Sequence, residues 1–250
     1  MKILHLSDLH FHSDNSKNQD ILSTLRNVEK NYPDHIIVIT GDIVDDGSEK
    51  QYKNARDALK TFDGRVFIAP GNHDFGAIGN FYSREKADRF DEFLSIPLNQ
   101  GGTFLRENKP VVNVKTDESD IVMFIALDTN LETYHPFDFA CGEVGEFQLA
   151  ELDMLLSNPT VPEMKKVLFF HHHPFMRNDP FMELKDAGEL ARIIYNRIDV
   201  VLFGHKHVMD SWKNRWGVPY MLAADNSPGK TSAGEITIEN GALSIDHVKI

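Results

Sequence analysis

Short apolar runs separated by amphipathic segments organise the first part of this chain. Residues 2–7 alternate apolar and polar positions, residues 35–40 are almost continuously apolar, and residues 65–69 form a third run. Such runs indicate β-strands, and a continuous one is typical of a strand covered on both faces. Between them, residues 15–32 and 48–62 show helical spacing, and Ser48 with Gln51 resembles a capping box. The β-α-β-α-β order predicts a parallel sheet with right-handed crossovers.

The second part of the chain repeats strands and helices less regularly. Regularity lapses between residues 75 and 109, although residues 83–94 have a helical pattern. Strand patterns return at 111–115, 121–128, 165–170 and 199–203, with helices predicted at 145–156 and 184–196. The tail predicts strands near 208–213, 218–223, 234–239 and 243–249. Because no repeat, low-complexity tract or linker interrupts the sequence, we predict one domain over residues 1–250.

The charge of the chain narrows the range of partners. Its 250 residues include 26 basic and 38 acidic side chains, which give a formal net charge of −12. Broad electrostatic binding to nucleic acid needs a basic surface, so no polymeric nucleic acid is expected. A small phosphorylated substrate remains compatible with this charge, because bound cations reverse the local field in an acidic pocket.

Cysteine usage and hydropathy favour a cytoplasmic protein. Cys141 is the only cysteine, so the chain has no internal disulfide that would suggest an oxidising compartment. No apolar stretch approaches the roughly 20 residues that span a membrane, so no membrane partner is expected. The first residues lead straight into a strand pattern and lack the apolar core of a signal peptide.

Side chains that bind metals directly follow five of the predicted strands. These stretches are Asp8-Leu9-His10, Gly41-Asp42, Gly71-Asn72-His73-Asp74, His171-His172-His173-Pro174 and Gly204-His205-Lys206-His207. Loops at the carboxyl ends of parallel strands build the binding crevice, so these side chains are expected to meet. Taken singly, an aspartate in a turn or a histidine at a strand end has a structural alternative. Five clusters at five strand ends favour a two-metal site that hydrolyses phosphate esters.

In order and approximate spacing, the five motifs resemble the full signature of the calcineurin-like metallophosphoesterases over residues 8–207. The resemblance implies an α/β fold: a four-layer αββα sandwich with two central mixed β-sheets flanked by helices. It also implies two sets of metal ligands that share one aspartate: Asp8, His10, Asp42 and His207 for one metal, and Asp42, Asn72, His172 and His205 for the other. Within the run 171–173, His172 is chosen by counting back from Pro174, as the family pattern suggests.

The mechanism that the resemblance implies is metal-assisted hydrolysis. Two divalent or trivalent ions, Mn or Fe in preference to Zn or Co, convert bound water to hydroxide that attacks phosphorus in line. His73, positioned by Asp74, resembles the family's histidine–acid pair, which stabilises the transferring group or protonates the leaving oxygen. Asn72, His73 and His173 are the predicted substrate contacts; for His173 the alternative is packing beside the site.

The chain looks most like the class III cyclic-nucleotide phosphodiesterases, and relatives acting on glycerophosphodiesters are also similar. We therefore expect a phosphodiesterase for a small phosphorylated substrate such as a cyclic nucleotide. A broad-specificity phosphomonoesterase is one alternative, and a non-catalytic metal-binding scaffold is another. Segments 75–82, 134–139 and 175–181 are expected to wall the substrate, by stacking aromatic side chains or merely by packing loops; Arg177 is a candidate phosphate contact. The tail strands offer an edge through which a homodimer is possible.

Overall fold

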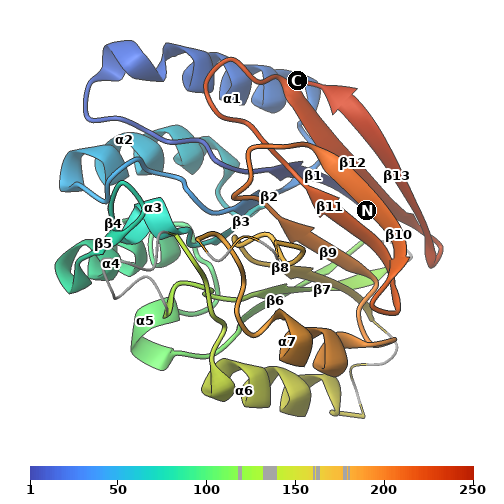
Figure 1. Cartoon of the computed structure of the whole chain (residues 1–250). Helices are drawn as coiled ribbons and strands as arrows, with labels where there is room; N and C mark the ends of the chain where they lie inside the picture. The colour runs from blue at the N-terminus through green and yellow to red at the C-terminus, as the bar shows by residue number, and fades with distance from the viewer. Residues whose placement is uncertain (118–119, 132–139, 160, 162–163, 177–178, 180) are drawn as a thin grey trace.

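Two β-sheets lie face to face at the centre of the molecule, between two layers of helices (Figure 1). The structure is a computed structural model that describes residues 1–117, 120–131, 140–159, 161, 164–176, 179 and 181–250. Helices α1 (Gln19–Asn31) and α2 (Glu49–Leu59) cover one sheet, and α6 (Glu146–Leu156) and α7 (Ala187–Ile194) cover the other. The predicted α/β architecture, with mixed sheets flanked by helices, is therefore confirmed.

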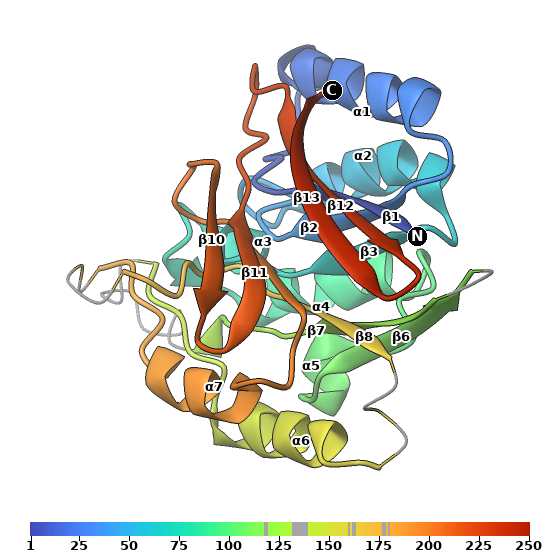
Figure 2. The same ribbon diagram turned by 90° about the vertical axis from the view of Figure 1, so that its right-hand side faces the viewer.

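The first sheet contains the three parallel strands that the sequence predicts. Its order is β13 (Ala242–Lys249), β12 (Ser232–Glu239), β1 (Lys2–Leu6), β2 (Ile36–Thr40) and β3 (Val66–Ala69). Strands β1, β2 and β3 are parallel, whereas β12 pairs antiparallel with β1 and with β13. The end of the described chain thus returns to cover the edge of β1, as Figure 2 shows.

The second sheet is also mixed, with four parallel strands between two antiparallel ones. Its order is β10 (Asp210–Arg215), β11 (Val218–Ala223), β9 (Val200–Phe203), β8 (Lys165–Phe169), β7 (Ile121–Ala126) and β6 (Val111–Thr116). Strands β11, β9, β8 and β7 are parallel, so their carboxyl ends lie at one edge of the sheet. Polar side chains that follow these strands can therefore meet.

Alternation along the second sheet explains why its central strands read as continuous apolar runs. On β8, Val167 and Phe169 belong to the core shared with the first sheet, whereas Leu168 packs with α6 and α7. On β9, Leu202 belongs to the core shared with the first sheet, and Val201 packs with α6 and α7. Because successive side chains point to opposite faces, a strand buried on both sides has to be apolar throughout.

Several short elements between residues 72 and 107 have no counterpart in the prediction. They are α3 (Asn72–Phe75), the hairpin β4 (Gly76–Ala77) with β5 (Phe81–Tyr82), and α5 (Phe104–Glu107). In contrast, α4 (Arg84–Phe90) with its π-helical continuation (Asp91–Ser95) matches the helical pattern at 83–94. The Asp91 carboxylate accepts hydrogen bonds from the backbone N–H groups of Phe104 and Leu105 at 2.9 and 3.0 Å and so holds α5. Elements of one turn or two residues are too short to show a period.

The predicted capping box at Ser48 is wrong. The Ser48 hydroxyl lies 3.0 Å from the hydroxyl of Ser13 and makes no cap hydrogen bond. The Gln51 side chain instead accepts hydrogen bonds from the backbone N–H groups of Asp45 and Asp46, at 3.2 and 2.9 Å. The pair therefore braces the loop that follows β2 rather than the first turn of α2.

Among the described residues, no helix has the length and apolar character needed to cross a membrane.

Replacing Phe124 by alanine is expected to lower the free energy of unfolding by about 3–5 kcal/mol. The ring of Phe124 on β7 lies 4.7 Å from that of Phe67 on β3, so the pair joins the two sheets. Both side chains are buried, and truncation leaves a cavity. Urea unfolding measures the change. Phe147→Ala is the control, because Phe147 is 55% exposed and its loss is expected to cost under about 1 kcal/mol; equal effects would contradict the prediction.

Candidate metal centre

The polar stretches that follow β1, β2 and β9 come together at one edge of the two sheets. Potential ligand atoms lie within 4.8 Å of one another in the set Asp8, His10 and His207. A second such set is His10, Asp42 and His73, and a third is Asp8, Asp42 and His171. The ring centroids of His172 and His205 are 4.5 Å apart. Loops of both sheets therefore contribute to one cluster of carboxylates and imidazoles.

The backbone of this cluster is unusual. Five of the seven predicted metal ligands have a positive φ, between 48° and 75°: Asp8, His10, Asp42, His205 and His207. For residues other than glycine this left-handed region is sparsely populated and costs on the order of 1–3 kcal/mol at each position. Such strain persists only where the surrounding structure imposes it, and it gathers at functional sites. The chain bends sharply after β1, β2 and β9, where successive side chains turn toward the same centre.

Four of the predicted ligand atoms are buried without a hydrogen-bond partner among the described residues. They are His10 Nε2, Asn72 Oδ1, His172 Nε2 and His205 Nε2. Leaving a buried polar atom unpaired costs about 1–3 kcal/mol, so four at one place need a compensating partner. Imidazole nitrogens and an amide oxygen are donors that transition metals accept. These residues therefore fit a metal site.

In three of the four predicted histidine ligands, the opposite nitrogen has a partner that holds the ring. His172 Nδ1 lies 2.8 Å from Thr129 Oγ1, and His205 Nδ1 lies 3.2 Å from His171 Nε2. His207 Nδ1 is 3.7 Å from an Asp225 oxygen. Partners of this kind fix the tautomer and direct Nε2 toward a metal.

The sequence interpretation assigned no role to Thr129, Asp225 or His171. Thr129 follows β7 and Asp225 follows β11, so the rule of polar residues after parallel strands would have found both. Applying that rule requires knowing that β7 and β11 lie in the parallel part of the sheet, which the sequence of these strands does not reveal. His171 adjoins the predicted ligand His172 and carried no separate signal.

Burial keeps three of the four predicted imidazole ligands neutral, as metal binding requires, whereas the hydrogen bond with Asp225 raises the pKa of the fourth, His207. The adjacent Asp42 outweighs burial at His171 and raises its pKa to about 9. Burial lowers the pKa of His10 to about 4 and those of His172 and His205 well below the usual range. Burial also raises the pKa of Asp8 to about 6. For Asp42 burial acts in the same direction, but the nearby His171 and His73 outweigh it and hold its pKa well below the usual value. The site thus offers neutral nitrogens together with an anionic carboxylate at Asp42.

In the tetrapeptide 71–74, the hydrogen-bond partners of Asp74 and His73 differ from the prediction. The Asp74 carboxylate, which was expected to position His73, accepts hydrogen bonds from the backbone N–H groups of Gly71 and Val44, each at 2.8 Å. His73 Nδ1 instead lies 2.8 Å from the carbonyl oxygen of Asp45. A one-turn helix that begins at Asn72 turns adjacent side chains in different directions. Asp74 therefore holds the loop, and the Asp45 carbonyl orients His73.

Gly79→Ala is expected to weaken metal binding at the Asn72 side of the site about 10- to 100-fold. The carbonyl oxygen of Gly79 accepts a hydrogen bond from Asn72 Nδ2 at 3.2 Å, which leaves Oδ1 available to a metal. An added Cβ would lie 2.1 Å from Asn72 Nδ2 and 3.0 Å from His73 Nε2. Titration of the metal-free protein with Mn²⁺ in a calorimeter measures the change.

Gly64→Ala is the matched control for this variant. Both glycines have a positive φ, +66° and +77°, but a Cβ at Gly64 meets no atom within 4 Å. The backbone penalty is therefore shared, and only Gly79→Ala displaces Asn72. Equal affinities in the two variants would contradict the positioning of Asn72 by the Gly79 carbonyl.

His173 lies in an aromatic cluster beside the site. Its ring centroid is 4.8 Å from that of Phe203 and 5.5 Å from that of Trp212, and its Nδ1 accepts a hydrogen bond from the Phe175 N–H. The side chain is buried, so packing is the role that its contacts support. The predicted substrate wall at 134–139, Arg177 and part of the wall at 175–181 lie outside the described residues.

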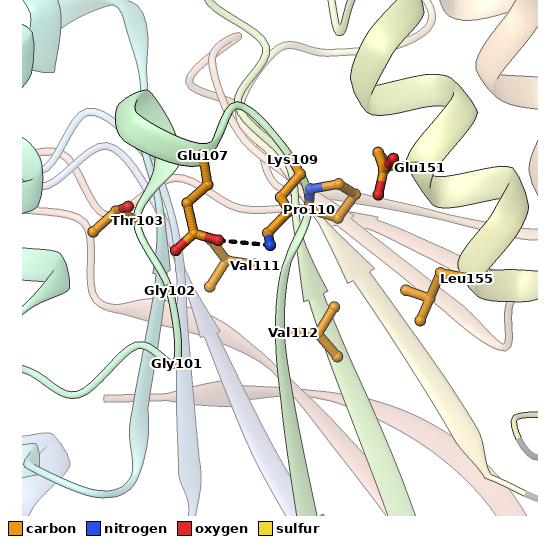
Figure 3. Close-up of a pocket in the computed structure, with 10 residues that line it drawn as sticks. All are labelled: Gly101, Gly102, Thr103, Glu107, Lys109, Pro110, Val111, Val112, Glu151 and Leu155. Carbon is orange, nitrogen blue, oxygen red and sulfur yellow. Dashed lines mark ion pairs between the residues drawn. The ribbon is translucent and has the colours of Figure 1, made fainter.

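A separate hollow of about 300 Å³ lies between the edge strand β6 and helices α5 and α6 (Figure 3). None of its lining residues belongs to the predicted site. Its lysine, Lys109, is 2.7 Å from a Glu107 oxygen and so is already neutralised by its neighbour. The hollow therefore lacks the unpaired buried groups that distinguish the metal centre.

Comparisons with known proteins bear on the family and the fold of this chain. A family model described as calcineurin-like phosphoesterase matches residues 1–209. A 3',5'-cyclic-nucleotide phosphodiesterase from Nostoc is 24% identical over 235 residues, which are 88% of this chain and 76% of that protein. A 3',5'-cyclic adenosine monophosphate phosphodiesterase from Haemophilus influenzae is 24% identical over 220 residues, 83% of this chain and 70% of that one. A dimetal phosphatase from Danio rerio shares the fold, with a TM-score of 0.66 at 14% identity over 99% of this chain and 95% of the other.

Proposed function

The chain belongs to the calcineurin-like phosphoesterase family and is a hydrolase of phosphoric esters, and from this premise we propose that its single domain is a phosphodiesterase with a two-metal site. The proposed substrate is a small diester such as a cyclic nucleotide, which the names of its relatives support. The observation that carries the proposal is the group of four buried ligand atoms that have no hydrogen-bond partner among the described residues.

The proposed ligands form two sets that share Asp42. Asp8, His10 and His207 complete the first set, and their potential ligand atoms lie within 4.8 Å of one another. Asn72, His172 and His205 complete the second, and each presents an unpaired buried atom. Two cations bound there, with Mn or Fe favoured, would neutralise charge on the phosphate and lower the pKa of a water molecule.

His73 is the proposed acid for the leaving oxygen. The carbonyl oxygen of Asp45 only accepts hydrogen bonds, so His73 Nδ1 carries a proton toward it at 2.8 Å. Nε2 is then the nitrogen that can donate a proton to, or hydrogen-bond with, the ester. The ring contacts the edge of His10 at a centroid distance of 4.8 Å, which places it beside the proposed metals. A positioned acid of this kind contributes on the order of 10²–10⁴ in rate.

A comparison of three esters tests the proposed function. Metal-free protein is assayed on bis-p-nitrophenyl phosphate, p-nitrophenyl phosphate and cyclic AMP, with and without added Mn²⁺. We expect metal-dependent cleavage of both diesters and slower cleavage of the monoester. Preference for the monoester would support the phosphomonoesterase alternative instead. Binding of metal without turnover of any ester would favour a scaffold and end both enzymatic interpretations.

A further inference from the structure

His171 contacts two proposed ligands although it belongs to neither set. Its side chain is completely buried, in the loop that follows β8. Nδ1 lies 2.7 Å from the carbonyl oxygen of Thr40. Nε2 lies 3.2 Å from His205 Nδ1 and 3.3 Å from Asp42 Oδ2. One imidazole thus connects the end of β2, the proposed bridging carboxylate and a proposed ligand from the second sheet.

The partner of Nδ1 defines where His171 carries a proton. A carbonyl oxygen has lone pairs but no hydrogen, so it accepts only. His171 Nδ1 therefore has to be the donor in its contact with Thr40. When the ring is neutral, Nε2 then has a lone pair and can only accept.

The same reasoning applied to His205 gives the complementary tautomer. His205 Nε2 is buried and has no hydrogen-bond partner among the described residues. To offer this nitrogen to a metal, His205 has to carry its proton on Nδ1, and a buried N–H needs an acceptor. The acceptor within reach is His171 Nε2, at 3.2 Å. His205 Nδ1 therefore donates a hydrogen bond to His171 Nε2, and His171 Nδ1 donates one to the Thr40 carbonyl oxygen.

We propose that His171 is a positioning residue that fixes the tautomer and ring orientation of His205 for metal binding. The inference rests on the proposed ligand sets and names a residue that acts through one of them. Asp42 Oδ2, 3.3 Å away, competes for His171 Nε2 while it carries no cation, and a cation bound to Asp42 would leave Nε2 to accept from His205. Ligating histidines commonly donate their other N–H to a carboxylate or carbonyl; here a second imidazole accepts it.

The packing around His171 leaves the ring little freedom. A Cβ built on Gly41 would lie 2.6 Å from His171 Nδ1 and 2.8 Å from its Cβ, so the ring occupies the space beside bare backbone. Its ring centroid is 4.9 Å from that of His205 and 5.3 Å from that of His172. A ring held from three sides keeps Nε2 directed at His205 Nδ1.

Two substitutions at His171 distinguish the effect of losing the hydrogen-bond acceptor from the effect of altered packing. His171→Leu fills the space without an acceptor, whereas His171→Gln can place an amide oxygen near the former Nε2. Calorimetric titration of each metal-free protein with Mn²⁺ gives the number and affinity of bound ions. For the leucine variant we expect one of the two affinities to fall about 10- to 100-fold while the other is kept. For the glutamine variant we expect two ions, with affinities within about 3-fold of the parent protein.

A spectroscopic measurement tests the tautomer directly. In the Zn²⁺-loaded parent protein with ¹⁵N-labelled histidine, the His205 resonances are expected to report a proton on Nδ1. A proton on Nε2 would overturn the inference, and so would a leucine variant that binds two ions with unaltered affinity or a glutamine variant that fails as leucine does. Thermal unfolding of each variant checks the fold, and the parent spectrum tests the tautomer even if both variants unfold. Absence of ester turnover alongside the expected metal results would refute the proposed function alone.

Discussion

Asp42→Asn is expected to remove both metal ions and to lower the rate of diester hydrolysis by at least about 10³-fold, since two-metal charge stabilisation is worth several kcal/mol. One oxygen of Asp42 accepts the backbone N–H of His73 at 2.9 Å, and the other lies 3.8 Å from His10 Nε2. The carboxylate is buried at the junction of both proposed ligand sets. Asparagine keeps the shape and the acceptor for His73 but removes the negative charge shared by the two metals.

Metal content after dialysis and the rate on bis-p-nitrophenyl phosphate are measured together for this variant. Asp246→Asn is the control, because Asp246 is an exposed aspartate on β13, away from the proposed ligands. The control is expected to keep two metals and the full rate. Two tightly bound metals and parent activity in Asp42→Asn would contradict the assignment of Asp42 as the shared ligand.

His73→Gln is expected to keep both metals and to lower the rate about 10²- to 10⁴-fold. His73 is half-buried, and its Nδ1 is held by the Asp45 carbonyl at 2.8 Å, so Nε2 is the nitrogen left for the ester. Glutamine is similar in length but cannot donate a proton as an acid. The separation of metal content from rate distinguishes this residue from Asp42.

Turnover number and bound metal are the two quantities to determine for His73→Gln. The control is His247→Gln, since His247 is exposed on β13. It should match the parent protein in both. Parent-like turnover in His73→Gln would remove His73 from the chemistry, and parallel loss of metal would make it a ligand instead.

Patterns local in the sequence predicted the strands of both sheets and the residues that gather at their ends. The runs 36–39 and 167–170 are apolar throughout because β2 and β8 lie in the interior of the sheets. Asp8, His10 and Asp42 follow strands that proved parallel, and parallel strands end at one edge. Each of these inferences needed only the order of side chains along a single segment.

The hydrogen bonds that orient the site were decided by the tertiary structure. Asp74 is adjacent to His73, yet its carboxylate holds Gly71 and Val44 while the Asp45 carbonyl holds His73. These choices depend on rotamers and on the path of loops that approach from other strands.

By itself the sequence determined the β-α-β-α-β order of elements along the chain and the kinds of side chain at each strand end. Both depend on hydrophobic periodicity and residue type, which are local properties. Only the tertiary structure decided that His171 faces His205, that Thr129 faces His172, and that Asp225 faces His207. These partners are separated by 18 to 43 residues along the chain, and nothing in a short window encodes their meeting. Neighbouring parallel strands of the second sheet, which end at the same edge, bring them together.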